Sequence, residues 1–400
     1  MASALRQTAI AAIGLCYSSL PPMKIQSTAS NFFRCSTRRY THSFLTFTPP
    51  YSLRNAPFPP TLNAQTVSTI TETVEEVVKL QVPLFERPPI FSTCSEDLLK
   101  WRKWAQDLAN SVGSKYLEAD GGPDSEDLLR EIEWLLEDAV DEYSPNLATF
   151  EAPITLNMRT SVEDLYSLWS DRVEKRRPFQ YIVGCSHWRD VVLSVQEGVL
   201  IPRPVTEELI EIAQKAIATD GSLATGVWAD LGTGSGALAI GLAQLLDPEG
   251  HVVAVDLSHV ALSIARYNVQ RYELQARVEV RQGSWFLPLQ DVNGKLAGVL
   301  SNPPYIPEDQ IPGLQAEVGK HEPRLALNGG QEGIEDLLHL CRGCISALRS
   351  GGFLGFETNG ERQADALADL LSCKSDSSFR DVQIIADYAG IPRFVTAFRC

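Results

Sequence analysis

The amino-acid sequence predicts an α/β protein whose larger part is a doubly wound, largely parallel sheet. From residue 205 onward, short apolar strands alternate with amphipathic helices, which is the pattern of successive strand-helix-strand units. Residues 92–177 have helical apolar periodicity instead, and residues 178–204 alternate apolar and polar side chains around a glycine, as β-hairpins do. We therefore expect a small helical domain over 92–177, a β-hairpin linker over 178–204 and an α/β domain over 205–400.

The amino-terminal arm has a distinct composition. Residues 1–71 contain no Asp or Glu and six Lys or Arg, and they are rich in Ser and Thr. This composition is typical of an organelle transit peptide, although an unstructured tail without a targeting role shares it. We expect a transit peptide over 1–71, with the chloroplast as the destination and the mitochondrion as the alternative. Residues 72–91 are predicted to be a linker.

Three amphipathic helices are expected in the helical domain. The first opens at Ser95, a predicted N-cap, and turns Trp101 toward the core. The others lie within 124–143 and 161–176. The second helix and its flanks carry nine acidic residues against a single base, Arg130. We interpret this as a solvated acidic face, with docking to a basic protein as the alternative.

Charge and cysteine content restrict the classes of partner. The chain carries 35 basic and 50 acidic residues, which disfavours nucleic acid as a partner because phosphate binding draws on Lys and Arg. No apolar run reaches the roughly 18 residues that a bilayer span needs, so no membrane span is expected. The eight cysteines show no framework spacing and are interpreted as reduced thiols. Cys341 and Cys344 have CxxC spacing, but their helical apolar context favours core packing over a zinc half-site, and no metal site is expected.

A glycine-rich turn indicates a ligand site. The segment "ADLGTGSGAL" places Gly232, Gly234 and Gly236 between a strand that ends at Asp230 and the start of a helix. A side chain at these positions would collide with a ligand lying across the strand tip. The next strand, "HVVAVDLS", ends at Asp256, whose carboxylate is placed to hold a pair of ribose hydroxyls. A dinucleotide and a nucleoside without phosphate both fit this pattern.

The fourth strand, "AGVLS", ends in Asn302, Pro303, Pro304 and Tyr305. The two prolines cannot continue a central strand, so they stop it and stiffen the loop. Because the carboxyl ends of parallel strands share one edge, this loop is expected beside the glycine turn. The Asn302 side-chain oxygen and the Pro303 carbonyl can accept hydrogen bonds from a planar nitrogen, and Tyr305 can pack on the flat group. This combination favours a nucleoside with a sulfonium tail and methyl transfer to that nitrogen.

The two motifs "DLGTGSG" and "SNPPY" resemble those of the class I S-adenosylmethionine-dependent methyltransferases that act on planar nitrogen. Further segments narrow the resemblance: "RPFQYIVG", "LIPRPVTE", "EVGKHEPRLALNGGQEGIE", "GGFLGFETNGERQ" and "DYAGIPR" are similar to those of the protein-(glutamine-N5) methyltransferases of peptide chain release factors. The resemblance covers about residues 95 to 396. It implies a Rossmann-like fold, S-adenosylmethionine as cofactor, and methylation of the Gly-Gly-Gln glutamine of a release factor, which tunes translation termination.

The resemblance also assigns residues to roles. It implies cofactor contacts from Gly232, Thr233, Gly234, Ser235, Gly236, Asp256, Trp285 and Asn302, and a catalytic loop made of Asn302, Pro303, Pro304 and Tyr305. The segment Ile201 to Pro204 would line the approach, and the helical domain would dock the substrate. Val205 and Ser284 stand where the family usually has acids, which we expect to affect affinity rather than reaction type. Residues 329–331, Gly-Gly-Gln, copy the substrate motif, and we expect a glycine turn there rather than self-methylation.

Two other functions compete with this one. The same loop serves nucleic-acid N-methyltransferases that act on the exocyclic amines of bases, but the acidic balance argues against them. A cofactor-binding protein that docks to the translation machinery without catalysis is suggested by Val205 and Ser284, and the intact Asn302 and Tyr305 argue against it. The sequence carries no signal of oligomeric state.

Overall fold

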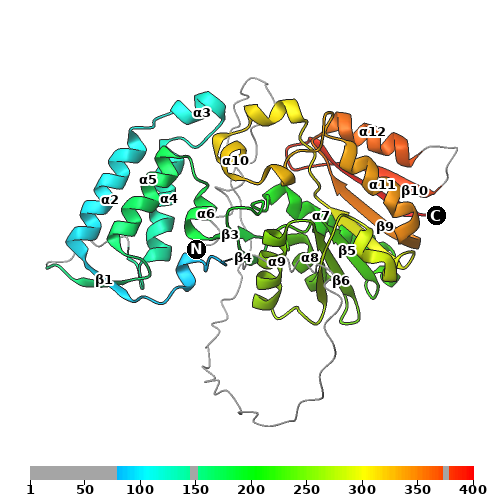
Figure 1. The fold of residues 1–400 in the computed structure, drawn as a ribbon, viewed down its shortest axis with the longest axis horizontal. Coiled ribbons are helices and arrows are strands. Elements are labelled where there is room, and N and C mark those ends of the chain that lie inside the picture. The colour runs from blue at the N-terminus through cyan, green and yellow to red at the C-terminus, as the bar shows by residue number, and fades with distance from the viewer. Residues whose placement is uncertain (1–78, 145–151, 373–377) are drawn as a thin grey trace, which may run out of the picture. The chain divides into compact units, whose positions relative to one another are not determined.

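The computed structural model describes residues 79–144, 152–372 and 378–400 (Figure 1). The predicted transit peptide, 1–71, and the first part of the predicted linker lie outside the described residues. Among the residues described, no helix combines the length and the apolar character needed to cross a membrane.

The amino-terminal part of the described chain is a helical domain with a small strand pair. Its elements are η1 (Leu84–Glu86), β1 (Phe91–Cys94), α2 (Ser95–Asn110), α3 (Lys115–Asp120), α4 (Ser125–Ala139), β2 (Thr155–Met158), α5 (Val162–Glu174) and α6 (Phe179–Val183). Strands β1 and β2 pair antiparallel. The core between the helices is fully buried and includes Trp101, Leu128, Ile132 and Trp169. The predicted apolar faces are therefore the ones that pack.

The helix starts are set by local hydrogen bonds. Helix α4 begins with a capping box, in which the Asp124 side chain accepts from the Asp127 amide at 2.9 Å and the Asp127 side chain accepts from the Asp124 amide. The predicted N-cap of α2 is wrong by one residue: Cys94 is the N-cap and Ser95 is the first helical residue. The Ser95 hydroxyl instead accepts from the Ile154 amide at 3.1 Å, which fastens the end of β1 to the start of β2.

Two acidic residues of α4 form ion pairs inside the domain. Glu131 is buried and forms a bidentate pair with Arg172 of α5, at 2.6 and 2.9 Å. Glu133 accepts from Arg102 of α2 at 2.6 Å. The predicted solvated acidic face is therefore wrong for these two positions, because arginines from neighbouring helices supply the counter-charges that the helix itself lacks.

The segment from residue 79 to 91, within the predicted linker, packs on the helices. Leu84 of η1 is fully buried in the helical core. Gln81 donates through its backbone amide to Gln196 at 2.8 Å and through its side chain to the Tyr181 carbonyl at 3.0 Å. These contacts make residues 79–91 part of the folded domain.

A β-hairpin follows the helices, as predicted. Strands β3 (Cys185–Trp188) and β4 (Val191–Ser194) pair antiparallel. The buried Trp188 side chain donates to the Arg203 carbonyl at 3.0 Å, and Asn268 of the α/β domain accepts from the Ser194 amide at 2.8 Å. The hairpin is thereby hydrogen-bonded to the domain that follows it.

The α/β domain is built on a seven-stranded sheet of order β10-β11-β9-β8-β5-β6-β7. The strands are β5 (Val227–Leu231), β6 (His251–Asp256), β7 (Val278–Gln282), β8 (Leu296–Ser301), β9 (Leu348–Glu357), β10 (Phe379–Ala386) and β11 (Pro392–Arg399). Strands β5 to β9 run parallel, while β11 is antiparallel to both β9 and β10. The predicted largely parallel, doubly wound sheet is confirmed, with an antiparallel edge that the strand-helix alternation did not indicate.

Helices cover both faces of the sheet. They are α7 (Glu207–Thr219), α8 (Ala237–Leu245), α9 (His259–Arg271), α10 (Ala316–His321), α11 (Glu335–Ala347) and α12 (Glu361–Leu371), with 3-10 turns η3 (Pro204–Thr206), η4 (Gly221–Leu223), η5 (Leu287–Val292), η6 (Glu308–Gly313) and η7 (Arg324–Ala326). One core contains Trp228 and residues of α7, α8 and α9. The other contains Phe356 and residues of α11 and α12, which lie beside β9 and β10 in Figure 1. The order reverses between β5 and β8, which is where ligands bind in such sheets.

Arginines of the helical domain reach the loop region that follows the fourth parallel strand. Arg172 donates to Glu317 of α10 at 3.0 Å, and Arg176 donates to the same carboxylate at 2.6 Å. Asp120 accepts from the Ala316 amide at 3.1 Å. The described residues belong to one compact unit, and this buried charge cluster joins the helical domain to the segment that leads away from the Asn-Pro-Pro-Tyr loop.

Candidate active site

The glycine turn has the backbone conformation that only glycine adopts easily. Gly232, Gly234 and Gly236 have φ angles of 78°, 55° and 86°. A Cβ at Gly232 would also lie 3.5 Å from the Trp285 ring. The turn is held in place because the amides of Gly232 and Thr233 both donate to the Val255 carbonyl at 2.9 Å. The chain is thus shaped to leave open space above the end of β5.

Two aspartates stand at the ends of β5 and β6. Asp256 accepts from the Gly234 amide at 2.8 Å and the Ser258 amide at 2.9 Å, and burial raises its pKa. Asp230 is fully buried and accepts from the Thr233 hydroxyl at 2.6 Å. Its second oxygen is buried without a hydrogen-bond partner, and burial raises the pKa of Asp230 to about 7. Asp230 was predicted only as the end of a strand, yet it anchors the glycine turn.

A cavity of about 350 Å³ opens over these strand ends. Eight of the predicted site residues line it: Gly232, Thr233, Gly234, Ser235, Asp256, Trp285, Asn302 and Pro304. Gly236, Pro303 and Tyr305 are not among its lining residues. The lining also includes Thr206 and Asp336, which the sequence did not single out, and Ser284, one of the two departures from the family pattern. The glycine turn and the Asn-Pro-Pro-Tyr loop therefore share one cavity, as the parallel topology predicts.

Trp285 occupies one wall of the cavity in an unusual backbone conformation. Its φ is 48°, which is uncommon for a non-glycine residue. The indole hydrogen-bonds to Asp336, whose pKa burial raises. The ring lies next to Gly232, so Trp285 faces a ligand site as well as the core.

The loop after β8 is held by a chain of buried polar contacts. The Asn302 side-chain nitrogen donates to the Thr206 hydroxyl at 3.0 Å, and that hydroxyl donates to Glu357 at 2.7 Å. The Tyr305 hydroxyl donates to the other oxygen of Glu357 at 2.9 Å. The Tyr305 ring packs against the core on the α11 and α12 face of the sheet. The predicted contact of Tyr305 with the flat group of a substrate stays a prediction.

The segment Ile201 to Pro204 is divided between cavity and core. Pro202 lines the cavity, whereas Ile201 is buried. Arg203 donates to the buried Glu322 at 2.6 Å. Val205, the other departure from the family pattern, packs against the apolar core, so it contributes to packing rather than to charge.

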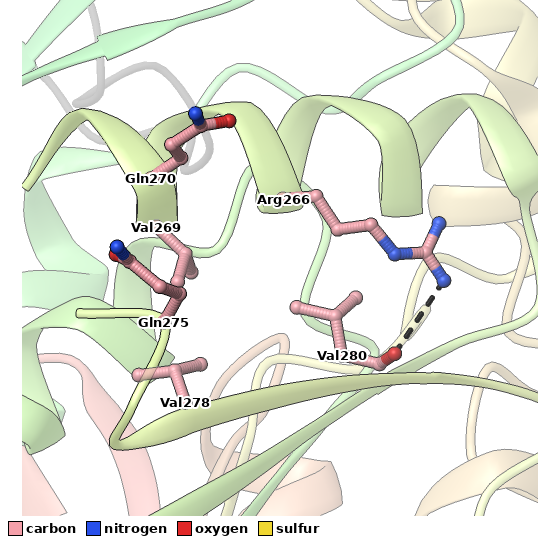
Figure 2. A pocket seen from close by; sticks show the side chains of 6 residues that line it. All are labelled: Arg266, Val269, Gln270, Gln275, Val278 and Val280. Atoms are coloured by element: carbon pink, nitrogen blue, oxygen red, sulfur yellow. Dashed lines mark hydrogen bonds between the residues drawn. The ribbon is translucent and has the colours of Figure 1, made fainter. Parts of the chain in front are cut away.

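A second hollow of about 310 Å³ lies between α9 and β7 (Figure 2). Its lining is Arg266, Val269, Gln270, Gln275, Val278 and Val280. Figure 2 shows Arg266 donating to the Val280 carbonyl, at 3.4 Å. The lining contains no carboxylate, thiol or imidazole, so this hollow has no group for acid-base or nucleophilic chemistry.

The CxxC cysteines lie on α11 and face the sheet. Cys341 and Cys344 are both buried in the core, and burial raises the pKa of Cys341 to about 12. Burial therefore favours the protonated thiols, which suits packing in the core.

The structure combines a doubly wound sheet with a glycine turn after the first parallel strand, an acid after the second and Asn-Pro-Pro-Tyr after the fourth. Together these features define a Rossmann-like class I methyltransferase. Residues 215–317 match the family model of the Methyltransferase small domain.

Comparison with similar proteins identifies the family within this class. The release factor glutamine methyltransferase of Synechocystis sp. is 42% identical over 270 residues, which cover 67% of this chain and 89% of that protein. The release factor glutamine methyltransferase of Thermosynechococcus vestitus is 37% identical over 303 residues, which cover 76% of this chain and 98% of that protein. The chain belongs to the release factor glutamine methyltransferase family. Among solved structures, the hMettl16 catalytic domain is 13% identical, with a TM-score of 0.43, and the match covers 66% of this chain and 88% of that one.

Proposed function

We propose that this protein transfers a methyl group from S-adenosylmethionine to the side-chain amide nitrogen of the Gly-Gly-Gln glutamine in an organellar peptide chain release factor. The observation that carries the proposal is the position of Asn302, which lines the same cavity as the glycine turn and Asp256. Two relatives named for this activity, matched over 89% and 98% of their lengths, support it.

The residues around the cavity fit S-adenosylmethionine. The glycines keep the strand tip free of side chains, Asp256 would hold the ribose hydroxyls, and Trp285 would lie beside the adenine. The cavity, at about 350 Å³, is in the range of small-molecule sites. When bound, the cofactor supplies an electrophilic methyl group next to the Asn302 loop.

The loop supplies orientation rather than acid-base chemistry. An amide nitrogen is a weak nucleophile because its lone pair is delocalised, but its N–H groups can be held by acceptors. The Asn302 side-chain oxygen and the Pro303 carbonyl would accept them and turn the face of the amide toward the methyl donor. The titratable lining side chains are the carboxyls of Asp256 and Asp336, with no His or Lys. Transfer would form the N–CH3 bond, break the S–CH3 bond and release one N–H proton to water, to which the methylated, positively charged nitrogen loses it readily. Orientation can recover about 7 to 11 kcal/mol of the barrier, so a strong base is not required before transfer.

Methylation of a base amine in nucleic acid is the alternative. The residues that line the cavity include no Lys or Arg, and the whole chain has a net charge of -15. Both facts disfavour a polyanion next to the reacting group.

We further propose the chloroplast as the site of action, with the mitochondrion as the alternative. The acid-free, Ser- and Thr-rich composition of residues 1–71 supports an organelle address. Imaging of residues 1–78 fused to a fluorescent protein tests this, and diffuse cytosolic signal contradicts it.

The function is tested by incubating the full chain with labelled S-adenosylmethionine and either an organellar release factor or total organellar RNA. A second form that begins at residue 79 keeps the buried Leu84 and removes the arm. We expect label on the release factor, located by mass spectrometry on the motif glutamine and absent when that glutamine is replaced by alanine. Label in RNA alone supports the alternative, and cofactor binding without transfer to either contradicts both.

A further inference from the structure

The carboxylate of Glu357, at the end of β9, is not among the residues that line the cavity, but it contacts Thr206, which is. It is fully buried. It accepts from the Thr206 hydroxyl at 2.7 Å and from the Tyr305 hydroxyl at 2.9 Å. Arg203 and Arg393 contribute favourable charge. Burial raises the pKa of Glu357, while the two hydroxyl donors and the two cationic side chains act in the opposite direction.

This arrangement fixes which way the Thr206 hydroxyl points. The Thr206 hydroxyl donates to the Glu357 carboxylate at 2.7 Å, so its single proton is committed to that contact. The Thr206 oxygen then has only lone pairs to offer on its other side. Asn302 meets that oxygen at 3.0 Å and must present its NH₂ group there.

The orientation of the Asn302 amide follows from this chain. With the nitrogen engaged by Thr206, the side-chain oxygen is the end left to accept from a ligand in the cavity. A flipped amide would place that oxygen against a hydroxyl oxygen whose proton is already used, and two acceptors facing each other lose a hydrogen bond. The Glu357 carboxylate thus sets the polarity of a side chain that it does not touch.

We propose that Glu357 and Thr206 are positioning residues that hold Asn302 with its oxygen toward the substrate, so that the site selects a primary carboxamide. This inference rests on the proposed function. A glutamine side chain offers N–H donors to this oxygen. A glutamate side chain has the same size and offers oxygen acceptors instead, so the site rejects it by leaving acceptors face to face.

The matched variants are Thr206→Val, which removes the hydroxyl at nearly constant volume, and Thr206→Ser, which keeps it. Thr206→Val is expected to lower kcat for release-factor methylation about 10- to 100-fold, while the Kd for S-adenosylmethionine by calorimetry stays within about twofold. Thr206→Ser is expected to stay within about threefold of the parent enzyme. Glu357→Gln is expected to lower kcat in the same way. The double variant, Thr206→Val with Glu357→Gln, should lower kcat little further than either single variant, because the two residues act through the same series of hydrogen bonds.

Two readouts separate orientation from a merely structural role. In the parent enzyme, a release factor with Gln→Glu at the motif is expected to compete poorly for the site, and in Thr206→Val it competes at least about fivefold better, because a free amide can turn its NH₂ toward the carboxylate. Independently of activity, ¹⁵N-asparagine spectra should show slowly exchanging Asn302 side-chain protons in the parent and Thr206→Ser proteins, but not in Thr206→Val.

The outcomes are distinct. A parent enzyme that does not methylate the release factor overturns the proposed function, and the Asn302 spectra then still decide the orientation. A Thr206→Val enzyme with kcat within twofold of the parent, unchanged discrimination against glutamate, or Asn302 protons as protected as in the parent overturns the positioning role.

Discussion

The buried arginine Arg172 gives the sharpest stability prediction. It is 3% exposed and donates to Glu131 at 2.6 and 2.9 Å and to Glu317 at 3.0 Å. Replacing it by methionine keeps most of the side-chain volume and removes the charge. Glu317 keeps its bond from Arg176 at 2.6 Å. Glu131 loses both hydrogen bonds that it receives from Arg172, and so becomes a buried carboxylate without its cation.

The expected loss of unfolding free energy comes from Glu131 alone, because Glu317 keeps a cationic partner and Glu131 does not. Breaking a buried ion pair from one side costs about 3 to 5 kcal/mol of unfolding free energy, and one such carboxylate is created. Burial already raises the pKa of Glu131. Loss of Arg172 raises it further, so the folded variant binds a proton more tightly than the unfolded chain. Stability from that proton is present at low pH and lost as pH rises through the folded pKa, so the deficit is largest at alkaline pH and shrinks toward pH 5.

Urea unfolding of the full chain at several pH values measures this deficit. The double variant Glu131→Gln with Arg172→Met should recover a large part of the loss, because no buried charge remains. Lys100→Met is the control: its pair with Asp97 is 70% and 55% exposed, so this variant should unfold at nearly the same urea concentration as the parent. An Arg172→Met protein within about 1 kcal/mol of the parent at pH 8 would refute the reasoning.

Four further predictions concern single residues of the α/β domain. Asn302→Ala should lower turnover about 100-fold or more while S-adenosylmethionine binding stays nearly intact, and an unchanged rate excludes its role. Asp256→Ala should weaken cofactor binding in calorimetry, and normal affinity removes it from the site. Burial raises the pKa of Asp230 to about 7, so this carboxylate binds a proton more tightly in the folded protein than in the unfolded chain. The unfolding free energy of the parent should therefore fall between about pH 4 and 7, by up to about 1.4 kcal/mol per pH unit. Asp230→Asn should lose this pH dependence. Gly298→Ala places a Cβ 2.3 Å from the Trp228 ring and should cost about 1 to 3 kcal/mol in urea unfolding, whereas an unchanged midpoint would mean that the ring moves freely.

The parts of the site that lie at strand ends could be predicted from the sequence. Gly232, Asp256 and Asn302 each follow an apolar strand, and parallel strands bring their carboxyl ends to one edge, so local pattern and topology together place them in one cavity. Thr206 and Glu357 were not predicted because their contact spans 151 residues and appears only when β9 lies next to β8. No local pattern distinguishes a hydroxyl that faces such a carboxylate from one in a turn.

The same limit explains the errors in the helical domain. The acidic positions of α4 look solvated when the helix is considered alone, and Arg172 and Arg102 that neutralise Glu131 and Glu133 come from other helices. Leu84 lies in a Pro-containing stretch without periodicity, so nothing local indicates that it is fully buried. Periodicity predicts which face of a helix packs. It does not predict which side chain from a distant part of the sequence pairs with a charge on that helix.

The spacing of the Asn302 support along the chain has a consequence for biogenesis. The glycine turn and the loop after β8 are synthesised by residue 305, but Glu357 ends β9 and is held in the sheet between β8 and the late strand β11. A chain that stops before β9 lacks Glu357, the acceptor of the Thr206 hydroxyl proton. The support of Asn302 therefore comes from a strand that is synthesised after the loop that it orients.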